Sequence, residues 1–270
     1  MKNNENIFNG DLFLLRQTPN VLRARGFRLY TEGAKRLIDL WLNGGAAVLG
    51  HTPSNILREL KNTASRGLYA PFPHFTESRF LKALFKLFPG CSFRIYACAP
   101  FELKKLFNEG NVKLWRPFTD PSSPFKTDDV PVFIPVIPGI QTWRDGLPAG
   151  LCIAGAKLQE NLSQLPPSDL LPPIQLAVAC RGIYDIIAQP QRAKPKLPRT
   201  EKALKNSQSK WQRQGIYLTL KEKPAHQEWE TLFHKFLEAG FLLPPASSFP
   251  LILPGELSDG EDAKLAAILS

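Results

Sequence analysis

Apolar residues recur at intervals of three and four along several stretches of the chain, which is the period of an amphipathic helix. The clearest case is residues 174–188, where Leu176, Ala179, Ile183 and Ile187 keep this spacing. Shorter apolar runs bounded by turn residues indicate strands. We therefore expect an α/β protein with a β-hairpin at 27–41, strands at 216–220 and 249–253, and helices at 53–66, 77–88, 174–188, 226–239 and 259–268.

Local signals predict where several elements begin and end. Gly44, Gly45 and Gly50 predict a turn after the hairpin, and Thr52 is expected to cap a helix with Pro53 at its first position. Ser258–Glu261 has the pattern of a capping box. Further predictions are a strand running into a helix at 93–103, a strand at 112–118, a proline-rich edge or irregular strand at 130–139, and a helix at 199–214.

The composition is that of a globular protein, since 43% of the 270 residues are hydrophobic and 21% are charged. No apolar run reaches the length of a membrane span, and the first residues lack the apolar core of a signal peptide, so we expect a cytoplasmic protein. Four cysteines without CxxC spacing predict reduced, mostly buried thiols. Four scattered histidines show no ligand spacing, and no metal site is expected.

The net charge of +10 is concentrated in one segment. Residues 191–223 hold ten Lys or Arg against Glu201 and Glu222. Two interpretations stay open, because such a segment can bind phosphate or another polyanion, or can simply be a solvated helix.

One set of motifs carries a family resemblance. The motifs are Gly26–Tyr30, a turn at Glu32-Gly33, Arg36–Asp39, Leu49–Pro53 and Leu87–Gly90. In order and spacing they resemble the amino-terminal segment of class III aminotransferases, pyridoxal-phosphate (PLP) enzymes of fold type I that include glutamate-1-semialdehyde aminomutase. Gly146–Gly150, the helix at 173–187 and the region after residue 215 resemble later parts of the same family. The alternative is a generic hairpin followed by an amphipathic helix.

The resemblance also shows where the cofactor equipment is expected, and there this sequence departs from the family. The S-G-T-E-A phosphate-binding turn aligns with Ala99, Pro100 and Phe101 before Glu102. Ala99 has no hydroxyl, Pro100 has no N–H, and Phe101 is bulky, so the turn is spoiled as a phosphate cup. The Schiff-base lysine is expected at Gln141, whose amide nitrogen cannot form an aldimine.

The family's enzymes are much longer, so the resemblance implies a reduced fold that lacks most of the large domain, including the Asp that pairs with the pyridine nitrogen. The implied division is an amino-terminal segment (1–92), a remnant of the PLP-binding domain (93–190), a basic linker or helix (191–214) and a small carboxy-terminal α/β domain (215–270). We expect a degenerate, non-catalytic aminotransferase-like protein that acts through binding or assembly and has no catalytic, cofactor-binding or metal residues.

Other functions stay open as alternatives. The chain could be a PLP-dependent enzyme with an unrecognised site, or a basic module that binds nucleic acid or another polyanion, although nucleic acid is not the partner we expect. From the family's habit and from Phe72, Phe75, Phe80, Phe85 and Phe88, we expect a homodimer, with a protein partner as a further possibility.

Overall fold

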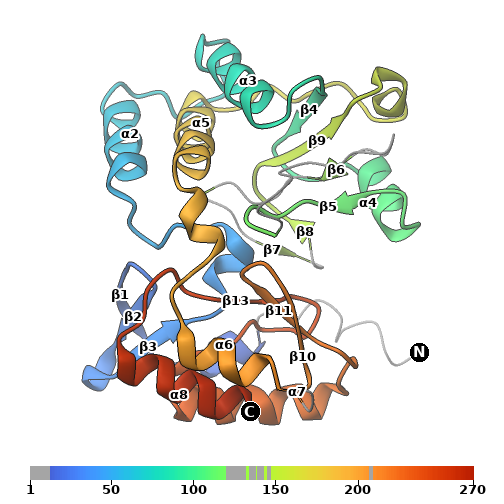
Figure 1. The fold of residues 1–270 in the computed structure, drawn as a ribbon. Coiled ribbons are helices and arrows are strands. Elements are labelled where there is room, and N and C mark those ends of the chain that lie inside the picture. The colour runs from blue at the N-terminus through green and yellow to red at the C-terminus, as the bar shows by residue number, and fades with distance from the viewer. Residues whose placement is uncertain (1–12, 120–131, 134–137, 139–142, 145–146, 207–208) are drawn as a thin grey trace, which may run out of the picture. The chain divides into compact units, whose positions relative to one another are not determined.

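The computed structural model describes residues 13–119, 132–133, 138, 143–144, 147–206 and 209–270 (Figure 1). The chain forms two compact units. The terminal unit combines residues 1–44, 48–52 and 191–270, and the central unit contains residues 45–47 and 53–190. The amino-terminal segment expected at 1–92 is therefore divided between the two units. The basic segment 191–214 and the carboxy-terminal region 215–270 both belong to the terminal unit.

The terminal unit holds a four-stranded sheet in the order β1 (Val21–Arg25), β2 (Arg28–Thr31), β3 (Arg36–Asp39), β12 (Phe241–Leu242). The first three strands are antiparallel, and β12 runs parallel to β3. Arg28 pairs with Ile38 in the β2–β3 hairpin, which confirms the hairpin predicted at 27–41. The strand that joins the two ends of the chain is thus β12, which comes from the carboxy-terminal region.

A second sheet of this unit contains β10 (Trp211–Gln214), β11 (Tyr217–Leu220) and β13 (Leu251–Ile252), all antiparallel. Its first strand corrects the helix predicted at 199–214, because helix α6 (Pro198–Leu204) ends well before β10 begins. Gly215, with a φ of 60°, and buried Ile216 form a two-residue turn, and the buried face of β10 begins at Trp211.

Three helices complete the terminal unit: α6, α7 (His226–Glu238) and α8 (Asp259–Leu269). The predicted capping box at the start of α8 is confirmed, since the Ser258 side chain accepts a hydrogen bond from the Glu261 N–H and the Ser258 N–H donates to the Glu261 carboxylate. Asp262 accepts hydrogen bonds from the backbone N–H groups of Arg199 and Thr200. The first turn of α6 is therefore capped from α8.

The central unit is built on the sheet β4 (Ser92–Tyr96), β9 (Cys152–Ala156), β6 (Val132–Phe133), β5 (Lys113–Leu114), in that order. β9 is antiparallel to both neighbours, and β5 is parallel to β6. The strand predicted at 112–118 is thus shorter than expected, and β6 lies between two strands rather than at an edge. A separate hairpin joins β7 (Trp143–Arg144) to β8 (Leu147–Pro148).

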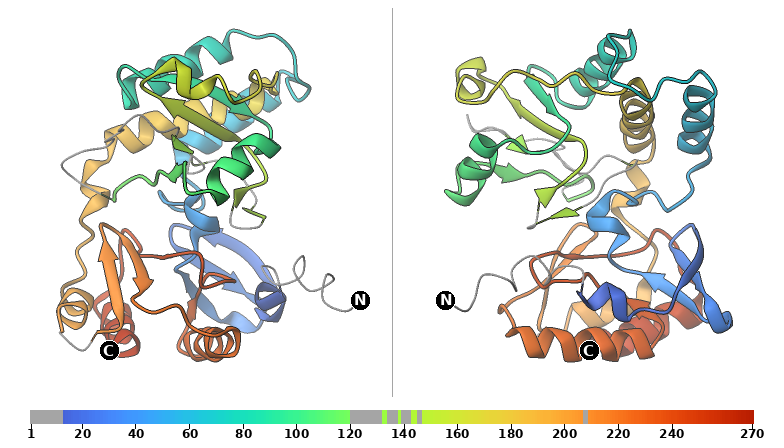
Figure 2. Two further views of the ribbon diagram at one scale, coloured as in Figure 1. Left: turned by 90° about the vertical axis from the view of Figure 1, so that its right-hand side faces the viewer. Right: turned by 180° about the vertical axis from the view of Figure 1, so that it is seen from behind.

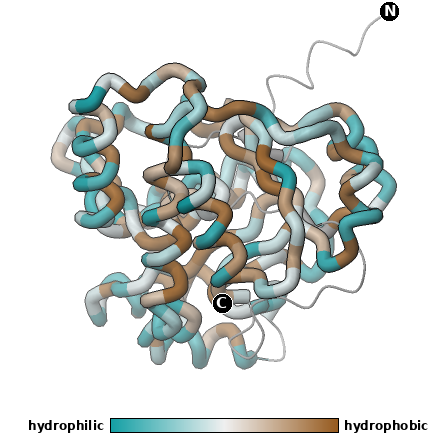
Figure 3. Tube along the Cα trace, turned by 90° about the horizontal axis from the view of Figure 1, so that it is seen from above, coloured by the Kyte–Doolittle hydropathy of each residue, from teal (hydrophilic) through white to brown (hydrophobic). Residues whose placement is uncertain are grey.

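Helices cover both faces of this sheet (Figure 2). Side chains of α3 (Thr76–Leu87) and α5 (Pro173–Ala188) share one core cluster with Phe93, Ile95 and Ile153, and α4 (Phe101–Asn108) packs on the other face with Tyr96, Cys152 and Ala154. α2 (Ser54–Ala64) packs against α5. Hydrophilic and hydrophobic positions are mixed along these helices, as expected for helices with one buried face (Figure 3). Short 3-10 turns lie at Leu14–Gln17, Glu32–Ala34, Leu42–Gly45, Gln159–Leu162 and Pro190–Ala193.

Several local predictions need correction. Pro53, not Thr52, is the cap residue of α2, and no side chain caps it. Phe80 and Phe88 are fully buried in the core, whereas Phe85 is 47% exposed, so the aromatic residues expected at an interface divide between two environments. Three of the four free cysteines are buried and Cys98 is exposed. Among the described helices, none combines the length and the apolar character needed to cross a membrane.

Candidate functional site

The turn between β4 and α4 is where the phosphate-binding motif was expected. Ala99 is buried, Pro100 is the residue that precedes α4 with extended backbone angles, and Phe101 begins the helix with 76% of its surface exposed. An anion at a helix amino terminus is bound by backbone N–H groups and small polar side chains. Because Pro100 has no N–H and Ala99 no hydroxyl, the residues present do not form such a cup.

A carboxylate of the chain itself lies at this turn. Asp169 Oδ2 accepts a hydrogen bond from the Ala97 N–H at 2.9 Å, and the Asp169 N–H donates to the Ile95 carbonyl at 2.8 Å. The Ser168 hydroxyl oxygen accepts a hydrogen bond from the Ile95 N–H, and the Pro166 carbonyl accepts one from the Tyr96 hydroxyl. The segment 166–169 thus satisfies the free edge of β4 and places a negative charge where a phosphate-binding turn needs positive potential.

The expected Schiff-base position, Gln141, lies outside the described residues. Lys157 follows β9 and is exposed. Lys126, the lysine that precedes Gln141 in the sequence, also lies outside the described residues. Within the described part of the chain, no group of His, Cys, Asp or Glu side chains is arranged to hold a metal ion.

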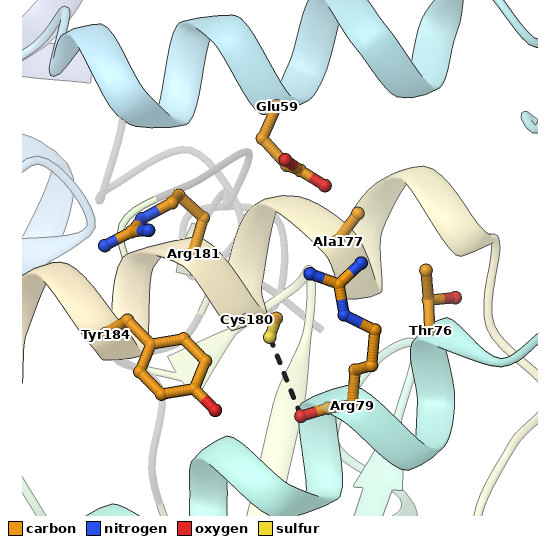
Figure 4. A pocket seen from close by; sticks show the side chains of 7 residues that line it. All are labelled: Glu59, Thr76, Arg79, Ala177, Cys180, Arg181 and Tyr184. Atoms are coloured by element: carbon orange, nitrogen blue, oxygen red, sulfur yellow. Dashed lines mark hydrogen bonds between the residues drawn. The ribbon is translucent and has the colours of Figure 1, made fainter.

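A pocket that sequence reasoning missed lies among α2, α3 and α5 of the central unit. It is a small cavity of about 60 Å³. Figure 4 shows Glu59 extending from α2 and Arg79 from α3 toward one another across α5, which contributes Arg181 and Tyr184. The lining residues are Glu59, Thr76, Arg79, Ala177, Cys180, Arg181 and Tyr184.

The charges around this pocket have different partners. Arg181 donates through Nε and Nη2 to Asp185 Oδ1, one helical turn along α5, so that guanidinium is largely engaged. Arg79 is exposed and has no ion pair in the described structure, and its guanidinium lies 5.9 Å from the centroid of the Phe75 ring. Glu59 likewise has no ion pair among the described residues. Two opposite charges therefore face the cavity without a salt bridge.

The floor of the pocket is a neutral thiol. Cys180 Sγ donates a hydrogen bond to the Arg79 backbone carbonyl at 3.6 Å, drawn as a dashed line in Figure 4. Burial raises the pKa of the Cys180 thiol. The thiol therefore contributes shape and polarity to the pocket, and no reactive thiolate.

The basic segment 191–223 does not form one continuous solvated face. Arg192 is buried, donates to the carbonyls of Val48 and Leu253, and lies over the Phe27 ring. Burial lowers the pKa of Arg192 to about 10. An open hollow of about 620 Å³ near β10 and β11 is lined by three lysines and two glutamates, Lys210, Lys221, Lys223, Glu222 and Glu228. Its charge is mixed, which favours the solvated interpretation.

Sequence comparison finds relatives of this chain that are themselves uncharacterized. No protein-family model matches it. An uncharacterized protein of Treponema pallidum is 29% identical over an alignment of 297 positions that covers 89% of this chain and 91% of that protein. An uncharacterized protein of Borreliella burgdorferi is 41% identical over 78 residues, 29% of each chain.

Solved structures give the fold. A glutamate-1-semialdehyde aminomutase from Pseudomonas aeruginosa superimposes with a TM-score of 0.64 at 12% identity, covering 96% of this chain and 89% of that chain. Plasmodium falciparum ornithine delta-aminotransferase gives 0.63 at 11% identity, covering 92% of each. At these identities the likeness shows the fold alone. The chain therefore has the α/β fold of the PLP-dependent aminotransferases and aminomutase, as the sequence motifs predicted.

Proposed function

We propose that this protein is a shortened, degenerate relative of the class III aminotransferases that acts in the cytoplasm through binding or assembly and catalyses no transamination. The observation that carries the proposal is the β4–α4 turn. Pro100 has no N–H and neither Ala99 nor Phe101 has a hydroxyl, so donors of a phosphate cup are missing, and the Asp169 carboxylate accepts the nearby Ala97 N–H. Gln141, at the position where the resemblance implies the aldimine lysine, points the same way.

Binding of PLP depends on the phosphate-binding groups and the lysine together. Each charge-assisted hydrogen bond to a phosphate contributes about 1.5–3 kcal/mol, and a neighbouring carboxylate opposes the phosphate charge. Without the lysine there is also no covalent anchor, since only an amine condenses with an aldehyde. We therefore expect neither tight nor covalent binding of PLP.

The test is chemical trapping. The full chain is incubated with PLP, reduced with borohydride and mapped by mass spectrometry, and its absorbance is recorded before reduction. We expect scattered, substoichiometric labelling of exposed lysines such as those at 194–223. A stoichiometric pyridoxyl adduct on one buried lysine would overturn the proposal and favour the alternative of an enzyme with an unrecognised site.

Self-association is part of the same proposal. Phe72 and Phe75 lie in the connection between α2 and α3 and are 53% and 57% exposed. Two aromatic side chains exposed this close together are typical of an interface. We propose a homodimer that buries them, and light scattering should give a dimer mass that falls toward the monomer mass in Phe72→Ser/Phe75→Ser. A monomer mass for the wild-type chain at high micromolar concentration contradicts this.

A further inference from the structure

We propose that the pocket among α2, α3 and α5 binds a small zwitterion, such as a free α-amino acid, with its carboxylate at Arg79 and its ammonium group at Glu59. The inference rests on three observations: a guanidinium and a carboxylate that have no ion pair among the described residues, and a small cavity that both of them line. It does not depend on the absence of PLP chemistry, because the pocket uses none of the residues of the β4–α4 turn.

The charge arrangement selects the class of ligand. A simple anion would gain the Arg79 guanidinium and be repelled by Glu59, and a simple cation would meet the reverse. Arg181 adds little free positive charge because Asp185 holds two of its nitrogens. A molecule that carries both charges a few bond lengths apart satisfies both side chains at once.

The size of the cavity limits the ligand further. At about 10–15 Å³ for each water-sized occupant, 60 Å³ holds on the order of four to six non-hydrogen atoms. That corresponds to the smallest amino acids. The neutral Cys180 thiol and the Ala177 methyl group line the pocket without adding charge, and the Tyr184 ring provides an apolar wall.

The competing interpretation is that Glu59 and Arg79 form an ion pair with each other in solution. The two helices that carry them, α2 and α3, pack on the same helix α5, so a direct ion pair would need side-chain movement only. A direct pair would close the pocket to ligands of either charge. The two interpretations therefore differ in whether a zwitterion binds better than its separate charged halves.

The experiment is a titration of the full chain with glycine, and separately with acetate and with methylammonium, followed by calorimetry. We expect glycine to bind with a dissociation constant in the millimolar range or below, and each single-charge probe to bind at least about tenfold more weakly. Comparable binding of acetate and glycine, or no binding of glycine at about 10 mM, would overturn the proposal.

Matched variants locate the site. Arg79→Gln and Glu59→Gln should each weaken glycine binding at least about tenfold. Lys82→Gln removes an exposed positive charge of α3 outside the pocket, and Glu77→Gln removes an exposed negative one. Both control variants should bind glycine with an affinity within about twofold of the wild-type value. Equal effects of pocket and control variants would also overturn the proposal. The comparison of the three probes on the wild-type chain needs no variant, so the test stands even where a variant misfolds.

Discussion

Glu261 at the start of α8 provides the sharpest test of how the terminal unit is held together. Its carboxylate accepts from Arg28 Nε at 3.1 Å and Nη2 at 2.6 Å, and from Arg36 Nη2 at 3.1 Å. Its side chain is only 11% exposed. The hydrogen bonds from Arg28, and after them those from Ser258, outweigh the effect of burial and lower the pKa of Glu261 from 4.5 to about 2. The contact joins β2 and β3 to α8, which are far apart in sequence.

The magnitude follows from linkage. A pKa held about 2.5 units low is equivalent to about 3 kcal/mol at 1.36 kcal/mol per unit. The unfolded chain takes up a proton near pH 4.5 and the folded chain only near pH 2, so this stability is complete above pH 4.5 and is lost as the pH falls toward 2. Glu261→Gln keeps a side chain suited to a capping box and removes only the charge. We expect a loss of about 2–3 kcal/mol in the free energy of unfolding at neutral pH.

Glu228 in α7 is the matched control. It occupies the same helical position, accepts from the Ala225 N–H at 2.8 Å, is exposed, and has no ion pair among the described residues. Glu228→Gln should change the unfolding free energy by no more than about 0.5 kcal/mol. Urea titrations of both variants at about pH 7 and pH 3 provide the measurement. Equal losses of unfolding free energy in the two variants at neutral pH would refute this role of Glu261, as would a loss in Glu261→Gln that is no smaller at about pH 3 than at about pH 7.

Two further predictions concern the terminal unit. Arg192→Met should destabilise it by about 2–5 kcal/mol, because two buried carbonyls lose their donor, whereas Lys194→Met at an exposed site should be nearly neutral; urea unfolding of both variants decides. Gly50→Ala should cost about 1–3 kcal/mol, since φ is +96° and the new Cβ would lie 3.1 Å from the Gly26 carbonyl oxygen. Gly260→Ala, inside α8 with open space around the new Cβ, should instead stabilise the protein by about 0.5–1 kcal/mol. Melting temperatures that shift in the same direction for both glycine variants would contradict these two predictions.

The elements that the sequence predicted well are those with local causes. The helix at 174–188 combines an apolar period with a proline at its start, and its observed bounds, Pro173–Ala188, agree closely. The Ser258–Glu261 box is specified by residues three apart, and the β2–β3 hairpin by its turn and alternating apolar positions. In each case the information lies within one or two turns of chain.

The elements that the sequence missed depend on partners distant in the chain. Asp262 caps α6 from more than 60 residues away, and Asp169 reaches Ala97 from 72 residues away. Neither contact has a local signal. The wrongly predicted helix at 199–214 does contain a local signal for a hairpin. Gly215-Ile216 lies between two runs that contain Trp211 and Tyr217, which is a two-residue hairpin pattern, and the basic charge of the segment obscured it.

The pocket among α2, α3 and α5 was invisible for a related reason. Glu59, Arg79 and Arg181 are ordinary charged residues of three amphipathic helices, and in a single sequence each is indistinguishable from a solvated position. Only the packing of two helices on a third brings two of these charges to one cavity. The arrangement is a tertiary property, so its discovery required the fold.

Several polar contacts that hold this fold together are made within the chain itself. At the end of β4 and the start of the β4–α4 turn, Ser168 accepts a hydrogen bond from the Ile95 N–H, the Pro166 carbonyl accepts one from the Tyr96 hydroxyl, and Asp169 accepts one from the Ala97 N–H. In the terminal unit, buried Arg192 and the Glu261 cluster use neither this turn nor the helix it begins. A phosphate at this turn would meet the negative charge of the Asp169 carboxylate, which already accepts the Ala97 N–H. The described contacts that hold these parts of the scaffold are all made within the chain, which is the condition that the proposed binding or assembly role on this fold requires.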